Sequence, residues 1–328
     1  MTSKKGALFL CLMFFLAMLL IPLASLGGGG GGSGGSAGPP GSGAAPKPTA
    51  GKFLIRDTAT GKILSVADDE FVRGTVACEL SPDAPAEALK AQAVAAYTYY
   101  SRIRETQRKQ KAASDFDAAP ASWNVYAPDD ARKQRWGSSY AKYEKAVGDA
   151  AGAVAGQVLT YGGALIDATY FATSAGNTED AADVWGSKCA YLVSVASPWD
   201  AFAGGYQSTA SFTEDDFRAR VLKAAANAVF TGDASGWVGA ADRSPAGTVK
   251  TIVLGGRTLT GGQVRSAFGL RSANFTIAHD GGKFTFTVKG YGHGVGMSQT
   301  GAEGMAKQGA SYRDILAWYY PGTKLTTV

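Results

Sequence analysis

Hydrophobic residues change their spacing several times along this chain of 328 residues, and each change predicts a different kind of element. Residues 7–26 form an almost unbroken apolar run behind Lys4 and Lys5. A helix of this length crosses the ~30 Å hydrocarbon core of a membrane, whereas a cleaved signal peptide usually has a shorter apolar core. We therefore expect residues 1–26 to be a retained single-pass anchor, with a cleaved signal peptide as the alternative. The positive flank would stay inside, so the rest of the chain would be extracytoplasmic.

Residues 27–52 have no hydrophobic periodicity and are rich in Gly, Ser, Ala and Pro. Such a segment cannot build a packed core and behaves as a flexible linker with a reach of ~25–30 Å. We expect it to tether the following region, residues 53–328, to the membrane.

Residues 53–328 have the mixed periodicity of a globular domain. Strands are predicted at residues 53–55, 63–66, 249–254, 275–278 and 284–288, with a strand–turn–strand at 157–170. Helices are predicted from Pro85 to a basic end at 102–111, and at residues 140–155, 214–226 and 312–319. Residues 71–80 fit either a strand or a short helix, and residues 115–136 are polar and turn-rich. Because helices and strands do not alternate regularly, we predict an α+β fold with short, mostly antiparallel strands around a substrate groove.

Composition and charge narrow the possible functions. The chain is 45% hydrophobic, which is enough for a sizeable core. Its net charge is +5, but the first fifty residues contribute three lysines and no acid, which leaves 5 − 3 = +2 for the rest. This charge is too small to indicate nucleic-acid binding. Cys78 and Cys189 could form a disulfide outside the cell or remain buried thiols, and no cysteine spacing is typical of structural zinc.

The chain has two histidines, in different contexts. His279 falls in a predicted hairpin turn, where we expect it to be solvated. His293 lies among glycines at every second position, which allow a ligand or another backbone segment to approach closely. Tight structural packing is the alternative interpretation. No serine has the context of a nucleophile elbow, so serine hydrolysis is not favoured.

Glu79 is an acid in an otherwise apolar run, directly before a predicted helix. Burial disfavours the charged form of a carboxyl group and would keep it protonated near neutral pH, as a general acid requires. A surface or capping glutamate is the other interpretation, because perturbed carboxyl groups are also structural.

Several long motifs follow one another in order, at residues 76–80, 87–96, 156–161, 168–179, 191–195, 197–200, 292–299 and 319–323. Together they resemble the SpoIID/LytB family. The likeness runs from about residue 53 to the C-terminus, and several motifs in the right order are a specific signal.

The resemblance implies that Glu79 is the catalytic residue of a lytic transglycosylase. Such an enzyme cleaves peptide-stripped peptidoglycan between N-acetylmuramic acid and N-acetylglucosamine and leaves a 1,6-anhydro end, without a cofactor. The implied setting is engulfment during sporulation, with a cell-wall amidase and other engulfment proteins as partners. The implied substrate-binding residues are Lys90, Tyr97, Ser174, His293, Ser298 and Gln299.

The chain departs from the family pattern at several positions. Tyr97 and Val193 replace an arginine and a lysine that commonly face the substrate in the family. Asp117, Ser122 and Trp123 occupy positions where some members bind zinc, so we expect no metal. The departures at residues 97 and 193 favour an alternative, in which the protein binds glycan and enhances or recruits an amidase without catalysis.

Overall fold

The structure, a computed structural model, describes residues 51–328, which form two compact units. Unit 1 comprises residues 51–83, 96–167 and 324–328, and unit 2 comprises residues 84–95 and 168–323. The expected membrane anchor and almost all of the linker lie outside the described residues. Within residues 51–328, no helix is both long enough and apolar enough to span a bilayer.

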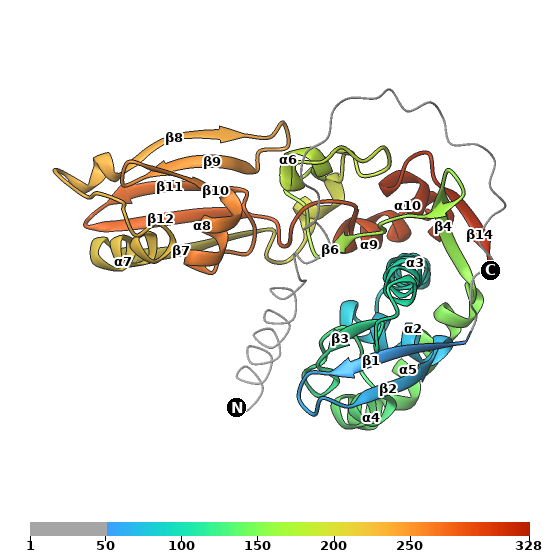
Figure 1. The fold of residues 1–328 in the computed structure, drawn as a ribbon. Coiled ribbons are helices and arrows are strands. Elements are labelled where there is room, and N and C mark those ends of the chain that lie inside the picture. Colours follow the sequence, from blue (N-terminus) through green and yellow to red (C-terminus); the bar gives the residue numbers. More distant parts are fainter. Residues whose placement is uncertain (1–50) are drawn as a thin grey trace, which may run out of the picture. The chain divides into compact units, whose positions relative to one another are not determined.

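Unit 1 contains an N-terminal hairpin, which two of the predicted strands form (Figure 1). Strand β1 (Lys52–Asp57) pairs antiparallel with β2 (Ile63–Ala67) and parallel with β3 (Phe116–Ala118). Phe53 and Ile55 alternate onto the same face of β1 and are fully buried. The two predicted strands are therefore confirmed.

The helices of unit 1 cover this small sheet and each other. They are α2 (Asp68–Glu79), the C-terminal part of α3 (Ala86–Lys109), α4 (Asp129–Trp136) and α5 (Tyr140–Ala153). Three acids in the first turn of α2 favour a helix N-terminus, which resolves the ambiguous segment 71–80 as a helix. The prediction for residues 115–136 was incomplete, because a third of that segment forms α4.

A second sheet of unit 1 joins distant parts of the chain. Strand β4 (Gln157–Tyr161) pairs antiparallel with β5 (Ala164–Leu165) and with β14 (Lys324–Thr327). The predicted turn between β4 and β5 is confirmed, since Gly162 and Gly163 both have positive φ angles that favour glycine.

Unit 2 begins with a region of short elements. They are the first turns of α3, β6 (Tyr170–Phe171), α6 (Ala181–Trp185), a 3-10 turn (Pro198–Phe202), β13 (Met297–Ser298), α9 (Gln299–Lys307) and α10 (Tyr312–Tyr319). β6 and β13 pair in parallel although they lie far apart in the sequence. Helix α10 begins and ends where the sequence predicts, because Ser311 and Asp314 form a capping box at its start.

The rest of unit 2 consists of two three-stranded antiparallel sheets with two helices (Figure 1). The strand order is β10-β9-β8 in one sheet and β11-β12-β7 in the other. The elements are β7 (Gln207–Thr213), α7 (Glu214–Ala224), β8 (Val238–Arg243), β9 (Val249–Leu254), β10 (Arg257–Thr260), α8 (Gly261–Phe268), β11 (Phe275–Asp280) and β12 (Lys283–Lys289).

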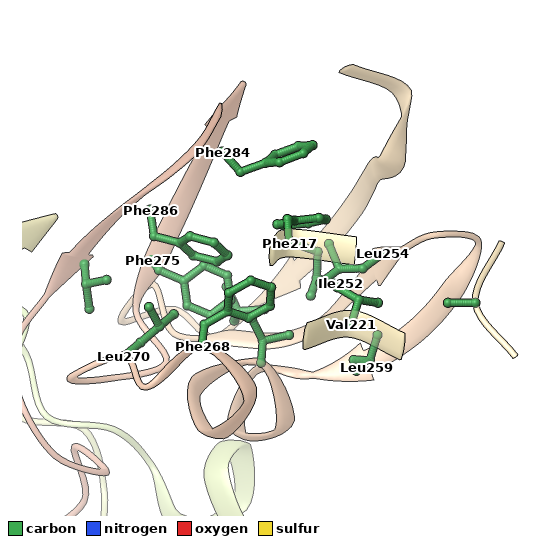
Figure 2. Packing of buried hydrophobic residues seen from close by; sticks show 14 of the residues in the cluster. Phe217, Val221, Ile252, Leu254, Leu259, Phe268, Leu270, Phe275, Phe284 and Phe286 are labelled. Atoms are coloured by element: carbon green, nitrogen blue, oxygen red, sulfur yellow. The ribbon is translucent and has the colours of Figure 1, made fainter. Parts of the chain in front are cut away.

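A cluster of aromatic side chains forms the core of this part of unit 2, as Figure 2 shows. Phe217 from α7 stacks on Phe284 from β12 with ring centroids 3.9 Å apart, and Phe268 packs 4.7 Å from Phe286. All four rings are almost completely buried. This core holds the two sheets and helices α7 and α8 together, because burial of large apolar surfaces is the main stabilising term in a domain.

The prediction for His279 was wrong. The residue lies in β11, and the turn contains only Gly281 and Gly282. Its Nε2 atom lies 2.8 Å from Oε1 of Glu214, and its side chain is mostly buried against Phe284. The hairpin itself and the predicted α+β class are confirmed.

Candidate functional site

Glu79 is the last residue of α2 in unit 1. The five residues before it are all buried, whereas Glu79 itself is partly exposed. Leu80 leaves the helix in an extended conformation while its backbone N–H still donates to the Val76 carbonyl at 3.0 Å. The helix end therefore brings one carboxyl group from the core of the unit towards its surface.

The surroundings of Glu79 contain a buried thiol and a cation. Burial raises the pKa of the Cys78 thiol well above its ordinary value, and the neighbouring charge of Glu79 raises it further. The positive charges of Arg135 and Arg132 act in the opposite direction on the same thiol. Cys78 therefore stays protonated and uncharged, and it is a free cysteine, as is Cys189 in unit 2.

Arg135 connects this region to an aromatic cluster, which consists of Trp123, Trp136 and Tyr143. Its guanidinium carbon lies 4.1 Å from the ring centroid of Trp123. The ring centroid of Trp136 lies 6.0 Å from that of Trp123 and 5.7 Å from that of Tyr143, and both pairs pack edge to face. The three rings are only partly buried, and flat rings of this kind stack on apolar faces of ligands while their polar groups remain available. The sequence reasoning missed this cluster, although the density of aromatic residues between 123 and 143 was a signal.

Tyr97 belongs to a largely buried group of three polar side chains in unit 1. Its hydroxyl donates to Oδ2 of Asp68 at 2.8 Å, and Nη1 of Arg104 donates to Oδ1 of the same carboxylate at 2.7 Å. Tyr97 is 6% exposed, and burial together with the Asp68 hydrogen bond raises the pKa of its hydroxyl. The structure thus gives Tyr97 a partner inside unit 1, and its contact with substrate stays a prediction.

In unit 2, two predicted substrate-binding residues converge on one carboxyl group that had no assigned role. Ser174 Oγ donates to Asp200 Oδ2 at 2.5 Å, and Ser298 Oγ donates to Oδ1 at 2.7 Å. All three residues are buried. Burial raises the pKa of Asp200, while the serine hydroxyls stabilise its charged form and oppose this shift. The sequence had marked residues 197–200 only as a motif.

The same network continues to helix α10. Ser197 also hydrogen-bonds Asp200, and its Oγ lies 2.6 Å from the hydroxyl of Tyr319. Gly301 packs against these two oxygens so closely that a Cβ atom at this position would collide with both. The Asp200 network is therefore tightly enclosed, and it fixes β13, α9 and α10 around one acid.

His293 is held by the backbone on both sides of its ring. Nδ1 accepts a hydrogen bond from the Val295 N–H at 3.1 Å, and the Tyr170 backbone provides a second hydrogen bond. Burial and the charge of Arg265 lower the pKa of His293 to about 4. The ring packs 5.3 Å from the Trp185 ring. At neutral pH His293 is thus a neutral, oriented ring rather than an acid or base.

The remaining predicted residues also lie in unit 2. Lys90 Nζ contacts Oε1 of Glu87 at 2.6 Å, and Glu87 in turn accepts from the Tyr312 N–H at the start of α10. Gln299 is buried and its amide nitrogen lies 3.4 Å from Oε1 of Gln92. Unit 2 therefore brings Ser174 and Ser298 together through Asp200, while Lys90 pairs with Glu87 within α3 and Gln299 contacts Gln92 of the same helix.

Comparison with known proteins identifies the class. Residues 56–161, which run from the end of β1 through α2 with Glu79 to the end of β4, match the family model described as stage II sporulation protein. The chain is 36% identical over 270 residues to stage II sporulation protein D of Bacillus subtilis (strain 168), which covers 82% of the chain and 77% of that protein. The corresponding protein of Bacillus amyloliquefaciens is 38% identical over 272 residues, with the same coverage. The chain therefore belongs to the stage II sporulation protein D family.

A more distant relative has a different name. The amidase enhancer of Bacillus subtilis (strain 168) is 29% identical over 306 residues, which cover 78% of the chain and 40% of that protein.

Proposed function

We propose that this protein is a lytic transglycosylase of the cell wall, with Glu79 as its general acid and base. The observation that carries the proposal is the position of Glu79, a partly exposed carboxyl group at the end of the largely buried helix α2. It follows the Cys78 thiol, on which the positive charge of Arg135 acts. Membership in a sporulation family supports a role in cell-wall processing during sporulation. The proposed substrate is a peptidoglycan strand from which the stem peptides have been removed.

One carboxyl group suffices for this reaction. Glu79 donates its proton to the glycosidic oxygen as the bond from C1 of N-acetylmuramic acid to that oxygen breaks, and N-acetylglucosamine leaves as an alcohol. The Glu79 carboxylate then accepts the proton of the C6 hydroxyl, whose oxygen forms the new bond to C1. Hydrolytic glycosidases need a second carboxylate, but an internal hydroxyl already has a high effective molarity.

The surroundings of Glu79 suit a glycan of this kind. Partly exposed rings of Trp123, Trp136 and Tyr143 provide apolar faces for sugar rings. Removal of the stem peptide leaves a lactyl carboxylate on each N-acetylmuramic acid, and the guanidinium group of Arg135 is a suitable partner for such an anion. These residues would position the strand, and Glu79 would perform the proton transfers.

The wider setting is part of the same proposal. We expect the N-terminal apolar run to anchor the chain in the cell membrane, with residues 53–328 on the extracytoplasmic side. A cell-wall amidase would prepare the substrate by removing stem peptides, and other engulfment proteins would act at the same place.

Incubation of the full-length protein in detergent with peptide-free glycan strands tests the reaction directly. Mass spectrometry should detect 1,6-anhydro-muramic ends, and Glu79→Gln should lower their rate of formation by roughly 10²-fold or more. Glu105→Gln, which changes an acid of α3 in the same unit, is the matched control and should retain the wild-type rate. Absence of anhydro ends, or equal rates for Glu79→Gln and wild type, would show that Glu79 is not the acid.

A non-catalytic role is the second candidate, and the likeness to an amidase enhancer favours it. The buried contacts of Tyr97, at the position where the family commonly has an arginine, point in the same direction. In that case the protein would bind glycan strands and accelerate an added cell-wall amidase, while the glycosidic bonds would remain intact.

A further inference from the structure

Glu179 in unit 2 is a buried carboxyl group without a full set of hydrogen-bond partners. The residue is 3% exposed, and its Oε2 atom has no partner among residues 51–328. Its backbone is fixed by a hydrogen bond, because the Glu179 N–H donates to the Gly294 carbonyl at 2.7 Å. A buried polar group that is left unsatisfied destabilises the folded state, and more so if it is charged. Glu179 therefore lacks a partner that such a group normally has.

The glycine-rich loop after β12 packs against the aliphatic part of this side chain. Gly294 has a φ of +85°, and a Cβ atom at this position would lie 2.8 Å from Cγ of Glu179. A residue with a side chain would be strained at this φ and would also displace the glutamate. Glycine at 294 therefore allows the backbone and the carboxyl-bearing side chain to pack in direct contact.

The groups around Gly294 do not supply the missing partner. His293 is the adjacent residue, but both of its ring nitrogens are engaged by backbone groups, and its lowered pKa keeps it neutral at pH 7. Arg265, whose charge acts on His293, donates from Nε to the Leu270 carbonyl. Trp185 contributes an aromatic face, 5.3 Å from the His293 ring. The surroundings thus combine an unpaired acceptor with apolar rings.

We propose that Glu179 is a saccharide-binding residue, whose carboxylate accepts a hydrogen bond from a hydroxyl or N-acetyl N–H group of a glycan strand. This inference rests on the proposed function for the identity of the strand. A carboxylate next to an aromatic face suits a sugar, which presents both hydroxyl donors and an apolar ring face. A metal ion is disfavoured, because residues 51–328 contain no group of three or more acidic, histidine or cysteine side chains that could hold one.

The proposal predicts opposite changes in stability and binding. Glu179→Gln removes a buried charge, so the free protein should unfold at a higher temperature than its parent. The same change weakens the acceptor, so binding of glycan strands should become weaker. A purely structural role predicts the reverse for stability, because loss of a structural contact lowers the unfolding temperature.

The binding test compares variants in the full-length Glu79→Gln background, so that strands are bound without being cleaved. Fluorescence anisotropy with labelled peptide-free glycan strands should show at least tenfold weaker binding for Glu79→Gln/Glu179→Gln than for Glu79→Gln alone. Glu179→Asp keeps the carboxyl group on a side chain that is shorter by one methylene group. It should also weaken binding, without raising the unfolding temperature. Asp215→Asn, at an exposed position in the first turn of α7, is the control and should bind like the parent.

The outcomes separate the two proposals. Unchanged binding by both Glu179 variants, or a lower unfolding temperature for Glu179→Gln, would overturn the role of Glu179. Failure of the Glu79→Gln parent to bind the strands would overturn it as well. Binding that depends on Glu179, together with a wild-type protein that forms no anhydro ends, would support this inference and refute the transglycosylase reaction.

Discussion

The two units bury their charged groups in different ways. In unit 1, the guanidinium group of Arg132 is completely buried and donates to Glu70 and to Glu144 at 2.9–3.1 Å, and to the Ala127 carbonyl. Burial lowers the pKa of Arg132, but the two carboxylates outweigh it, so the net pKa lies above its ordinary value. Arg104 is paired with Asp68 in a similar way. Unit 1 therefore neutralises its buried cations with acids.

In unit 2, the two acids that are almost completely buried have no ion pair with a cation in the described part of the chain. Asp200 accepts hydrogen bonds from serine hydroxyls, and the Oε2 atom of Glu179 accepts none. A buried acid that is paired with a cation has a structural role, whereas a buried acid without a cation partner is typical of sites that act on a ligand. The comparison thus distinguishes acids that are paired with buried cations from buried acids that have no cation partner, and among the latter Glu179 has an oxygen without any hydrogen bond.

Replacement of Arg132 should produce the largest effect on stability. Arg132→Met leaves Glu70 and Glu144 facing each other without a cation, and loss of one partner of a buried pair costs about 3–5 kcal/mol. Urea denaturation should show this as a large drop in the midpoint. Arg56→Met removes the exposed pair with Asp117 and serves as the control, with almost no change expected. Equal midpoints for both variants would contradict the structural role of the buried pairs.

Local signals in the sequence predicted several elements well. Thr213 and Ser311 cap their helices through side-chain hydrogen bonds to the first turn, and such caps are visible as short motifs. Helix α8 was missed because it begins with Gly261 and Gly262, which are poor helix formers, and it depends on a capping box formed by Thr260. The β6–β13 pair was missed because it joins segments more than a hundred residues apart, beyond the reach of any local pattern.

The candidate site was predicted to a smaller extent. The motif around Glu79 made it the candidate catalytic residue, and this role stays a prediction; the structure places it at the end of α2, in the segment that the sequence left open between strand and helix. The burial of Asp200 and the missing partner of Glu179 depend on contacts with residues near 294–298, which only the fold brings close. The aromatic cluster of unit 1 needs the geometry of α4 and α5, so composition alone could not define it.

Acidification should destabilise unit 2 through His293. The pKa of His293 is about 4 in the folded protein and near 6.5 when unfolded, so the unfolded state binds more protons between these values. The contribution of His293 to folding stability is therefore constant above pH 6.5 and falls as the pH drops from 6.5 to 4, by about 1–3 kcal/mol in total. Thermal denaturation at pH 7, 5 and 4 measures this loss.

His293→Gln should flatten this part of the pH dependence, while His279→Gln should keep it. His279 lies in β11, where its ring is paired with Glu214, and it takes no part in the contacts of His293. If both variants lose the same amount of stability on acidification as the wild type, the carboxyl groups rather than His293 govern the response.

The smallest change in stability is expected for the replacement of Asp200, the buried acid of unit 2 that accepts hydrogen bonds from serine hydroxyls instead of pairing with a cation. Asp200→Asn keeps the shape and one acceptor, but one serine hydroxyl loses its acceptor, which costs about 1 kcal/mol at pH 7. Because burial raises the pKa of Asp200, the wild type gains stability as the pH falls through that raised value and its carboxyl becomes neutral. The deficit of the variant should therefore be larger at pH 4 than at pH 7. A deficit that shrinks on acidification would mean that Asp200 is stabilised as a charged group, as the acids of unit 1 are, and the distinction between the units would not hold for this residue.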